Sequence, residues 1–582
     1  MQRSSLRFAA SLILAIAVLP ACSDNATDPA ALIPVTAAVW NIQRTSQTYH
    51  SAWAAAPDDV YAVGDGGTIL HYNGAGWRTM ASTTAFILLG VWGSAANDIF
   101  AVGDAGTILH YDGSAWARMS VGLSGPLFDV WGTSGQDVFA VGNAGTILHY
   151  DGGRWNGMNS TSSDLLLDVW GTARDDVYAV GLGGTIVHYN GSVWSGADTV
   201  PPVTLTGVWG SAANDVYVVG DAGSILHYDG SRWRGMNSTT TVDLEAVWGT
   251  AFDDVYAVGD SGTVLHYDGA AWSDAVSGSG AVLRDVTGSP GGDAYATGTL
   301  GTIMRRDPTG WNPLISGGTG DVLLSVWAGT DGAAWAVGDK GILLSWDGAL
   351  WSPVTSPTPE DLWAVWGRSA DDVFAAGRNG TVLHRDATGW AQQSTPTRSL
   401  LLDLWGFPSG DVFAVGQNGI TLRYDGAVWD SVPSGTTERL LSVWGSSPDN
   451  VVAVGGAGIV LRFDGNAWSR MPDFATPDLW GVWGSSASAV FAVGLGGSIF
   501  SYNGNQWNTM NSPTGRTLWD LAGVSGNELY ASGSGGNVLR FDGSGWARTA
   551  TGTGLALLGV AVSGTGDVFA VGANGIIVGI TK

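Results

Sequence analysis

The sequence predicts an all-β fold built from fourteen copies of one short unit. An anchor tryptophan recurs every 39 residues, with one extra residue between the seventh and eighth slots, and a second tryptophan follows 24 residues after thirteen of the slots. These two columns contain 24 of the 30 tryptophans. The anchor slots hold Trp53, Trp92, Trp131, Trp170, Trp209, Trp248, Thr287, Trp327, Trp366, Trp405, Trp444, Trp483, Ala522 and Ala561.

Residues 167–194 show how one unit is expected to fold. Runs of four to six residues, rich in β-branched and aromatic types, are each closed by Asp, Asn or Gly, which tolerate tight turns. No run has the helical period, so each unit predicts a four-stranded antiparallel meander. Because one meander cannot bury both faces of its sheet, neighbouring units must pack face to face. The expected architecture is therefore a β-propeller.

Fourteen units exceed the usual size of one propeller, which has about four to eight blades. The extra residue falls between slots seven and eight, and both Thr287 and Ala561 lack the anchor tryptophan. The sequence thus predicts two tandem seven-bladed propellers, in residues 35–310 and 311–582. The alternative is one large single ring.

Ring closure is expected to use strands from both ends of the chain, since an open sheet edge invites aggregation. We expect Trp40 to supply the outer strand of the blade begun at Thr287, and Trp311 to supply that of the blade begun at Ala561. In the single-ring alternative, Trp40 closes the unit begun at Ala561 instead.

Composition and charge exclude several classes of protein. With 25 Lys and Arg against 51 Asp and Glu, the net charge is −26, which would repel nucleic acid. A single cysteine excludes intramolecular disulfides and cysteine-rich zinc sites. A hydrophobic content of 45% excludes a wholly disordered chain.

The N-terminus predicts export. Residues 1–21 combine Arg3 and Arg7 with an apolar stretch too short to span a bilayer, as in a signal peptide. The sequence Leu-Pro-Ala-Cys ending at Cys22 resembles the lipobox of bacterial lipoproteins, which implies that Cys22 is acylated and that residues 22–34 form a tether. Ser23 after the cysteine implies the outer membrane. The alternative is an ordinary signal peptide cut near Ala21.

The string Ala-Val-Gly-Asp-x-Gly-Thr-Ile-Leu-His-Tyr-Asp-Gly-x-x-Trp at residues 101–116 resembles the BNR/Asp-box type of repeat, in particular the photosystem II assembly-factor-like propellers of bacteria. In the Asp box the aspartate stands five residues before the tryptophan, whereas Asp112 stands four before Trp116. The resemblance implies that this aspartate forms a turn. It also implies a binding or assembly role without carrying over a photosynthetic one.

Two columns of polar residues are candidates for chemistry. Seven of the eight histidines share one strand position, but one per blade is too far apart to ligate a single metal ion. We expect them to bond backbone or a carboxylate near the turn. The turn between strands two and three carries acids that turn propensity explains; the alternative is an acidic mouth that holds Ca²⁺ or basic groups. The histidines are His71, His110, His149, His188, His227, His266 and His384; the acids are Asp65, Asp104, Asp221, Asp260 and Asp339.

No group of residues predicts catalysis. Glycoside hydrolysis, known among Asp-box propellers, needs a distinctive pair of carboxyl groups, and the four glutamates lie in different repeats. We expect no enzyme activity, no cofactor and no metal. The variable blade connections predict a scaffold that binds a protein partner at the cell envelope, with no nucleic acid and with the membrane contacted only through the lipid. Glycan binding is the alternative, and a glycoside hydrolase is a weaker one.

Overall fold

The computed structural model describes residues 41–580, apart from residues 46, 75, 197–201, 290–292, 308–309, 318–321, 331, 349–350 and 472–476. The predicted signal peptide, Cys22, the tether and Trp40 lie outside the described residues. Strands and short 3₁₀ turns make up all the regular structure described, and no helix there is long and apolar enough to cross a membrane.

The chain folds into fourteen four-stranded antiparallel blades, as the repeat predicts. In the second blade, β6 (Leu88–Ala95), β7 (Asp98–Gly103), β8 (Thr107–Tyr111) and β9 (Trp116–Met119) run in sequence order from the inner to the outer edge. A three-residue 3₁₀ turn joins the second and third strands of every blade. In the turn after β7, Gly106 has φ 61°, and a Cβ there would lie 2.5 Å from the carbonyl oxygen of Leu123, so glycine is required.

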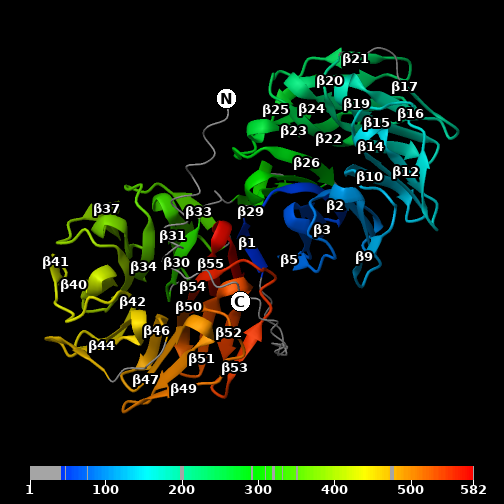
Figure 1. Ribbon diagram of the computed structural model, residues 1–582. Coiled ribbons are helices and arrows are strands. Elements are labelled where there is room, and N and C mark those ends of the chain that lie inside the picture. Colours follow the sequence, from blue (N-terminus) through cyan, green and yellow to red (C-terminus); the bar gives the residue numbers. More distant parts are fainter. Residues whose placement is uncertain are drawn as a thin grey trace.

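The fourteen blades form two rings of seven (Figure 1). Each inner strand packs against the inner strand of the next blade; β26 closes the first ring on β2, and β54 closes the second on β30. The remaining inner strands of the first ring are β10 (Leu127–Ser134), β14 (Leu166–Ala173), β18 (Leu205–Ala212) and β22 (Leu244–Ala251), between β2 (Tyr49–Ala56) and β26 (Leu283–Gly288). Those of the second are β30 (Leu323–Ala328), β34 (Leu362–Ser369), β38 (Leu401–Gly406), β42 (Leu440–Ser447), β46 (Leu479–Ser486), β50 (Leu518–Ser525) and β54 (Leu557–Val562).

The rings close differently from the expectation. Strand β29 (Gly310–Gly317) pairs with β28 (Ile303–Asp307) of its own blade, so the expectation that Trp311 closes the blade begun at Ala561 is wrong. The N-terminal strand β1 (Asn41–Thr45) pairs antiparallel with β56 (Ile577–Ile580), and it also pairs parallel with β29, the outer strand of the blade begun at Thr287, and antiparallel with β5 (Trp77–Met80). The physical reason is that β29 is itself the fourth strand of the seventh blade, so β1 serves as the fourth strand beside β56 and meets β29 across the junction of the rings.

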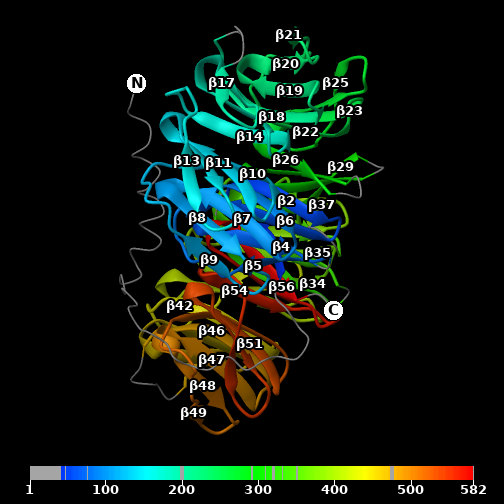
Figure 2. The ribbon, with the colours of Figure 1, turned by 90° about the vertical axis from the view of Figure 1, so that its right-hand side faces the viewer.

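The first described strand therefore lies at the junction of the rings, and the chain then completes the first ring before it forms the second. Figure 2 shows the junction, where β5 (Trp77–Met80) lies near β54 and β56. One hydrophobic cluster spans both rings and includes Tyr49 and Tyr295 from the first with Val578 and Ile580 from the second. The hydroxyl of Thr79 also donates a hydrogen bond to the carbonyl of Gly552 in the second ring.

The anchor tryptophans fill the gap between adjacent inner strands. A Cβ on Gly93 would lie 2.8 Å from the indole of Trp53 in the preceding blade, and the same contact recurs between Gly171 and Trp131. Where the preceding anchor is not tryptophan, the glycine is replaced: Ala54 follows the Thr287 blade, Val562 the Ala522 blade and Ala328 the Ala561 blade. Indole and glycine thus form one packing unit across each blade boundary.

Candidate functional site

The histidine column ties two strands together in each of seven blades. Each Nε2 atom lies within hydrogen-bond distance of an aspartate Oδ1 twelve residues earlier, at 2.6–2.9 Å. The imidazole also stacks on an aromatic ring of the second strand, as His71 does on Tyr61 at a centroid distance of 4.4 Å. The expected bond to a carboxylate near the turn is confirmed. The pairs are Asp59–His71, Asp98–His110, Asp137–His149, Asp176–His188, Asp215–His227, Asp254–His266 and Asp372–His384.

In five blades of the first ring a hydroxyl completes this cluster. Ser94, for example, donates to Oδ2 of Asp98, whose Oδ1 bonds His110. The equivalent donors are Thr133, Thr172, Ser211 and Thr250. The carboxylate is the centre, and no bond joins hydroxyl to imidazole, unlike the nucleophile–base pair of a hydrolase. The cluster therefore fixes strands and does not activate the hydroxyl.

Arginine replaces histidine in several blades with the same effect. Arg305 bonds Asp293 at 3.0 Å, Arg423 bonds Asp411 at 2.6 Å, and Arg540 bonds Glu528 at 3.3 Å. Arginine replaces histidine, yet the bond to the carboxylate on the neighbouring strand remains. The column therefore has a structural role that does not depend on the chemistry of imidazole.

The acidic turn column opens each 3₁₀ turn on the face that also carries the blade connections. Asp65 lies 3.0 Å from Nε2 of His50 and its own amide bonds Thr48 just before β2. Among the described residues, no group of three or more His, Cys, Asp or Glu is placed to hold a metal ion. These carboxylates lie one per blade and surround the face rather than converging.

A β-bulge places one residue per blade at the hub of this connection face. Every inner strand shifts register three residues before its anchor, which takes that residue out of the ladder. Residues from adjacent blades then meet, as Arg284 Nη1 does with Glu245 Oε1 at 2.5 Å. The first-ring bulge residues are His50, Leu89, Phe128, Leu167, Thr206, Glu245 and Arg284; the second-ring ones are Leu324, Trp363, Leu402, Leu441, Trp480, Trp519 and Leu558.

The hub of the second ring is therefore apolar, whereas that of the first is mixed. Trp480 and Trp519 meet edge to face with centroids 4.8 Å apart, and Arg439 from a connection lies 5.4 Å above Trp480. All three hub tryptophans are half-buried. Sequence reasoning missed the three hub tryptophans. The available signal was that Trp363, Trp480 and Trp519 lie outside both tryptophan columns, each three residues before an anchor slot.

Five aspartates next to the bulges join adjacent blades around the hubs. Each accepts a backbone N–H from the next inner strand, for example Asp403 from Val443 at 2.8 Å and Asp285 from Ala52 at 2.9 Å. Burial raises the pKa of Asp403 to about 7 and that of Asp285 to about 6. The others are Asp129, Asp168 and Asp520. Sequence reasoning missed these aspartates as well. Aspartate is also common in turns, so an aspartate two residues before an anchor does not by itself indicate a contact between blades.

Comparisons with known proteins support the fold. The chain is similar to the solved structure of PorZ, described as an essential bacterial surface component of the type-IX secretion system of Porphyromonas gingivalis: TM-score 0.52, 14% identity, covering 93% of this chain and 87% of that one. A structure described as YCF48 bound to D1 peptide gives TM-score 0.40 and 15% identity over 49% of this chain and 99% of that one. No family model and no curated protein matches the sequence. At this identity the likeness to PorZ shows the propeller fold alone.

Proposed function

We propose that the protein is an exported, non-catalytic scaffold, anchored by a lipid on Cys22 after removal of residues 1–21, that binds a protein partner at the cell envelope. The tether of residues 22–34 would hold two propeller domains above the membrane. The bacterial surface location of PorZ supports an envelope setting by analogy of fold only.

The observation that carries the proposal is that the blades of the two rings are built alike, whereas the connections and turns on one face of each ring differ in charge. In the first ring, the connections and 3₁₀ turns contain no lysine or arginine. In the second ring the same elements contain Lys340, Arg378, Arg398, Arg439 and Arg516. The described acids of this face in the first ring are Asp65, Asp104, Asp164, Asp221, Asp243 and Asp260. Repeat units that differ at one face and not in their cores are typical of a binding surface.

A catalytic alternative has no comparable support. The histidines of the column recur at one strand position in seven blades, and each is held by a carboxylate. A catalytic site would instead place one acid and one base in separated environments. We therefore propose that the protein is not an enzyme.

Affinity capture from the native envelope tests the proposal. The lipidated wild-type protein should retain a specific partner, quantified by mass spectrometry, and W480S/W519S should weaken or lose that partner. The matched control is V524S at the other end of β50, where Val524 is 56% exposed, and it should retain the partner. Equal retention by all three proteins would contradict binding at the connection face of the second ring.

The half-buried hub tryptophans also fit the alternative of a glycan-binding surface, since sugar rings stack on aromatic faces. A titration with an oligosaccharide panel separates the two. Saturable quenching of tryptophan fluorescence by one glycan, absent in W480S/W519S, would favour the glycan, whereas no response together with a captured protein favours the scaffold.

A further inference from the structure

One blade connection of the first ring departs from the repeat. The residue eight positions before the anchor is described in eleven connections, and in ten of them it is a serine or threonine. Its hydroxyl accepts the backbone N–H two residues later at 3.0–3.2 Å, which fixes the turn. Between the second and third blades this residue is Leu123, which cannot accept that bond. An apolar side chain, 38% exposed, stands in place of a turn contact.

A second exposed apolar side chain lies beside the same blade. Phe86, in the connection that enters the second blade, is 47% exposed. The carbonyl of the next residue, Ile87, accepts the amide of Asp104 at 3.0 Å, where the 3₁₀ turn of this blade begins. At the end of that turn, a Cβ on Gly106 would lie 3.1 Å from the Cβ of Leu123. Phe86 and Leu123 therefore flank one turn from its two sides.

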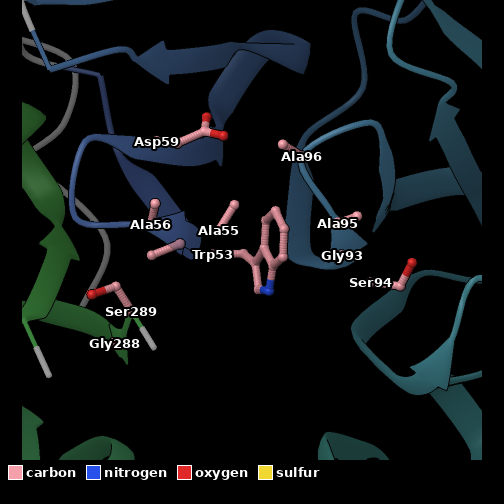
Figure 3. A pocket seen from close by; sticks show the side chains of 11 residues that line it. Trp53, Ala55, Ala56, Asp59, Gly93, Ser94, Ala95, Ala96, Gly288 and Ser289 are labelled. Carbon is pink, nitrogen blue, oxygen red and sulfur yellow. The ribbon is translucent and has the colours of Figure 1, made fainter. Parts of the chain in front are cut away.

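Half-buried apolar side chains continue from this turn to the hub. The bulge residues Leu89 and Phe128 belong to the second and third blades, and a Cβ on Gly90 would lie 3.0 Å from the carbonyl oxygen of Phe128. In contrast, the residues around Trp53 on the opposite face are mostly alanine, glycine and serine (Figure 3). Exposed apolar side chains that gather on one face are typical of a surface that binds a partner. The second-blade patch consists of Phe86, Leu89, Leu123 and Phe128.

Carboxylates surround the second-blade patch. Asp104 lies in the flanked turn itself, and no described residue pairs with its carboxylate. Asp65, in the turn of the first blade, has a side chain that is 43% exposed. Asp164 lies at the turn of the third blade, where its carbonyl accepts the amide of Gly145. Because the connections and turns of this ring contain no lysine or arginine, the patch suits an apolar segment that carries positive charge. The same carboxylates would repel an anionic membrane surface.

We propose that the second-blade patch binds a segment of a protein partner that packs an apolar side chain against Phe86 and Leu123 and places a lysine or arginine side chain at Asp104. This inference rests on the proposed function only for the source of the segment. It assigns a binding surface and a partner chemistry to the first ring, whereas the hub tryptophans test the connection face of the second.

Selection from a library of random dodecapeptides, with the full mature chain as bait, tests the proposal. Peptides retained by the wild type and not by F86S/L123T should be enriched in lysine or arginine next to an apolar residue. A synthetic copy of such a peptide should bind the wild type with a Kd of roughly 0.1 mM and at least about threefold more weakly when the salt is raised from about 0.05 to about 0.5 M. The absence of any peptide that distinguishes the two proteins, or enrichment of acidic peptides, would overturn the proposal.

Variants that copy residues of other repeats locate the site while keeping the fold. L123T introduces the residue of most other connections and should weaken binding of the selected peptide about tenfold. D104N introduces the residue that Asn143 provides in the next blade, and it should weaken binding about fivefold. The matched controls are F252S, where Phe252 is 61% exposed on the opposite face, and D260N at the same turn position of the sixth blade. Both controls should stay within about twofold of the wild type. Equal effects of D104N and D260N would contradict the assignment.

Two other occupants of the patch would give different results. If the N-terminal segment filled it, the peptides would bind only after deletion of residues 1–35. If a second copy of the chain filled it, sedimentation would show self-association of the wild type that F86S/L123T abolishes, without a selected peptide. Either result would overturn the proposal. A native partner that F86S/L123T retains and W480S/W519S loses would overturn this assignment and leave the proposed function standing.

Discussion

At the scale of single residues, the fold depends on a contact between each indole and the glycine of the next blade. The indole columns are visible in the sequence, but the glycine partner is not, because it follows the next anchor 40 residues later. The replacement of this glycine by Ala54, Ala328 and Val562 wherever the preceding indole is missing could have revealed the contact. Glycine is present here because a larger side chain would collide with a ring.

Adding one methyl group at this contact should destabilise the protein. In G171A the new Cβ would lie 2.5 Å from the Asp176 carbonyl oxygen and 2.8 Å from the Trp131 indole. We expect a loss of roughly 1–3 kcal/mol in the free energy of unfolding, measured by urea denaturation. The control G157A places its Cβ where no atom lies within 4 Å and should change the stability little. Equal effects of the two substitutions would show that the indole contact is not tight.

The hub aspartates give stability a dependence on pH. The pKa of Asp403 rises from an ordinary 3.8 to about 7 in the folded protein, so the folded state binds the proton more tightly than the unfolded state. Its contribution to stability is therefore fully present below pH 4 and falls as the pH rises from about 4 to 7. D403N keeps an acceptor for Val443 and cannot ionise. The difference in melting temperature between D403N and wild type should be larger at pH 8 than at pH 5.

D285N provides an internal comparison for this effect. The pKa of Asp285 is raised to about 6, so its effect should be complete about one pH unit lower than that of Asp403. A difference in melting temperature that is the same at pH 5 and pH 8 for both variants would show that these carboxylates titrate normally in the folded protein.

At the scale of elements, the blades follow from the sequence, and the ring closure does not. The 39-residue period and the turn residues predicted the four-stranded blades and the two rings. The destination of β1 could not be predicted from its own residues, since any outer edge accepts a short strand. The structure decides it: β29 is the fourth strand of the seventh blade, and β1 becomes the fourth strand beside β56 while also pairing with β29.

Removal of β1 should open the second ring and leave the middle blades of the first ring closed, because β1 is the fourth strand of the last blade and only lies against β5 and β29 of the first ring. Deleting residues 1–48 exposes the edge of β56, and we expect faster amide exchange in β54–β56, with aggregation. Strands β6 to β25 (Trp272–Asp274) should stay protected. Hydrogen exchange with mass spectrometry measures both. Deleting residues 1–35 retains β1 and serves as the control. Loss of protection in the first ring and not in the second would contradict the closure described here.

The candidate site was predictable only in part for a related reason. The histidine and aspartate columns repeat in every unit, and their strand tie could be inferred from spacing. Bulge residues such as Trp480 depart from the repeat, and their meaning depends on which blades are neighbours. That information exists only once the ring has closed.

At the scale of the whole molecule, the chain presents two connection faces of different charge on rings joined by β1 and one shared hydrophobic cluster. The described connections and turns of the first ring carry six aspartates and no basic residue, whereas those of the second carry both signs, with Arg378 paired to Asp361 and Arg439 to Asp478. The electrostatic field of the first ring's connection face would attract a basic segment of a partner protein, and the second ring's face would suit an apolar or acidic segment. Because the two faces belong to one chain, a partner segment bound at one face would raise the effective concentration of a second segment at the other face.

Site-specific photo-crosslinking in the native envelope tests the central claim, that a protein partner binds a connection face, most directly. A photoreactive phenylalanine at Trp519 and another at Val524 lie at opposite ends of β50, so they differ in face and in little else. The account predicts a crosslinked protein from position 519 and none from position 524. Crosslinks from position 524 alone, or from neither position, would contradict it.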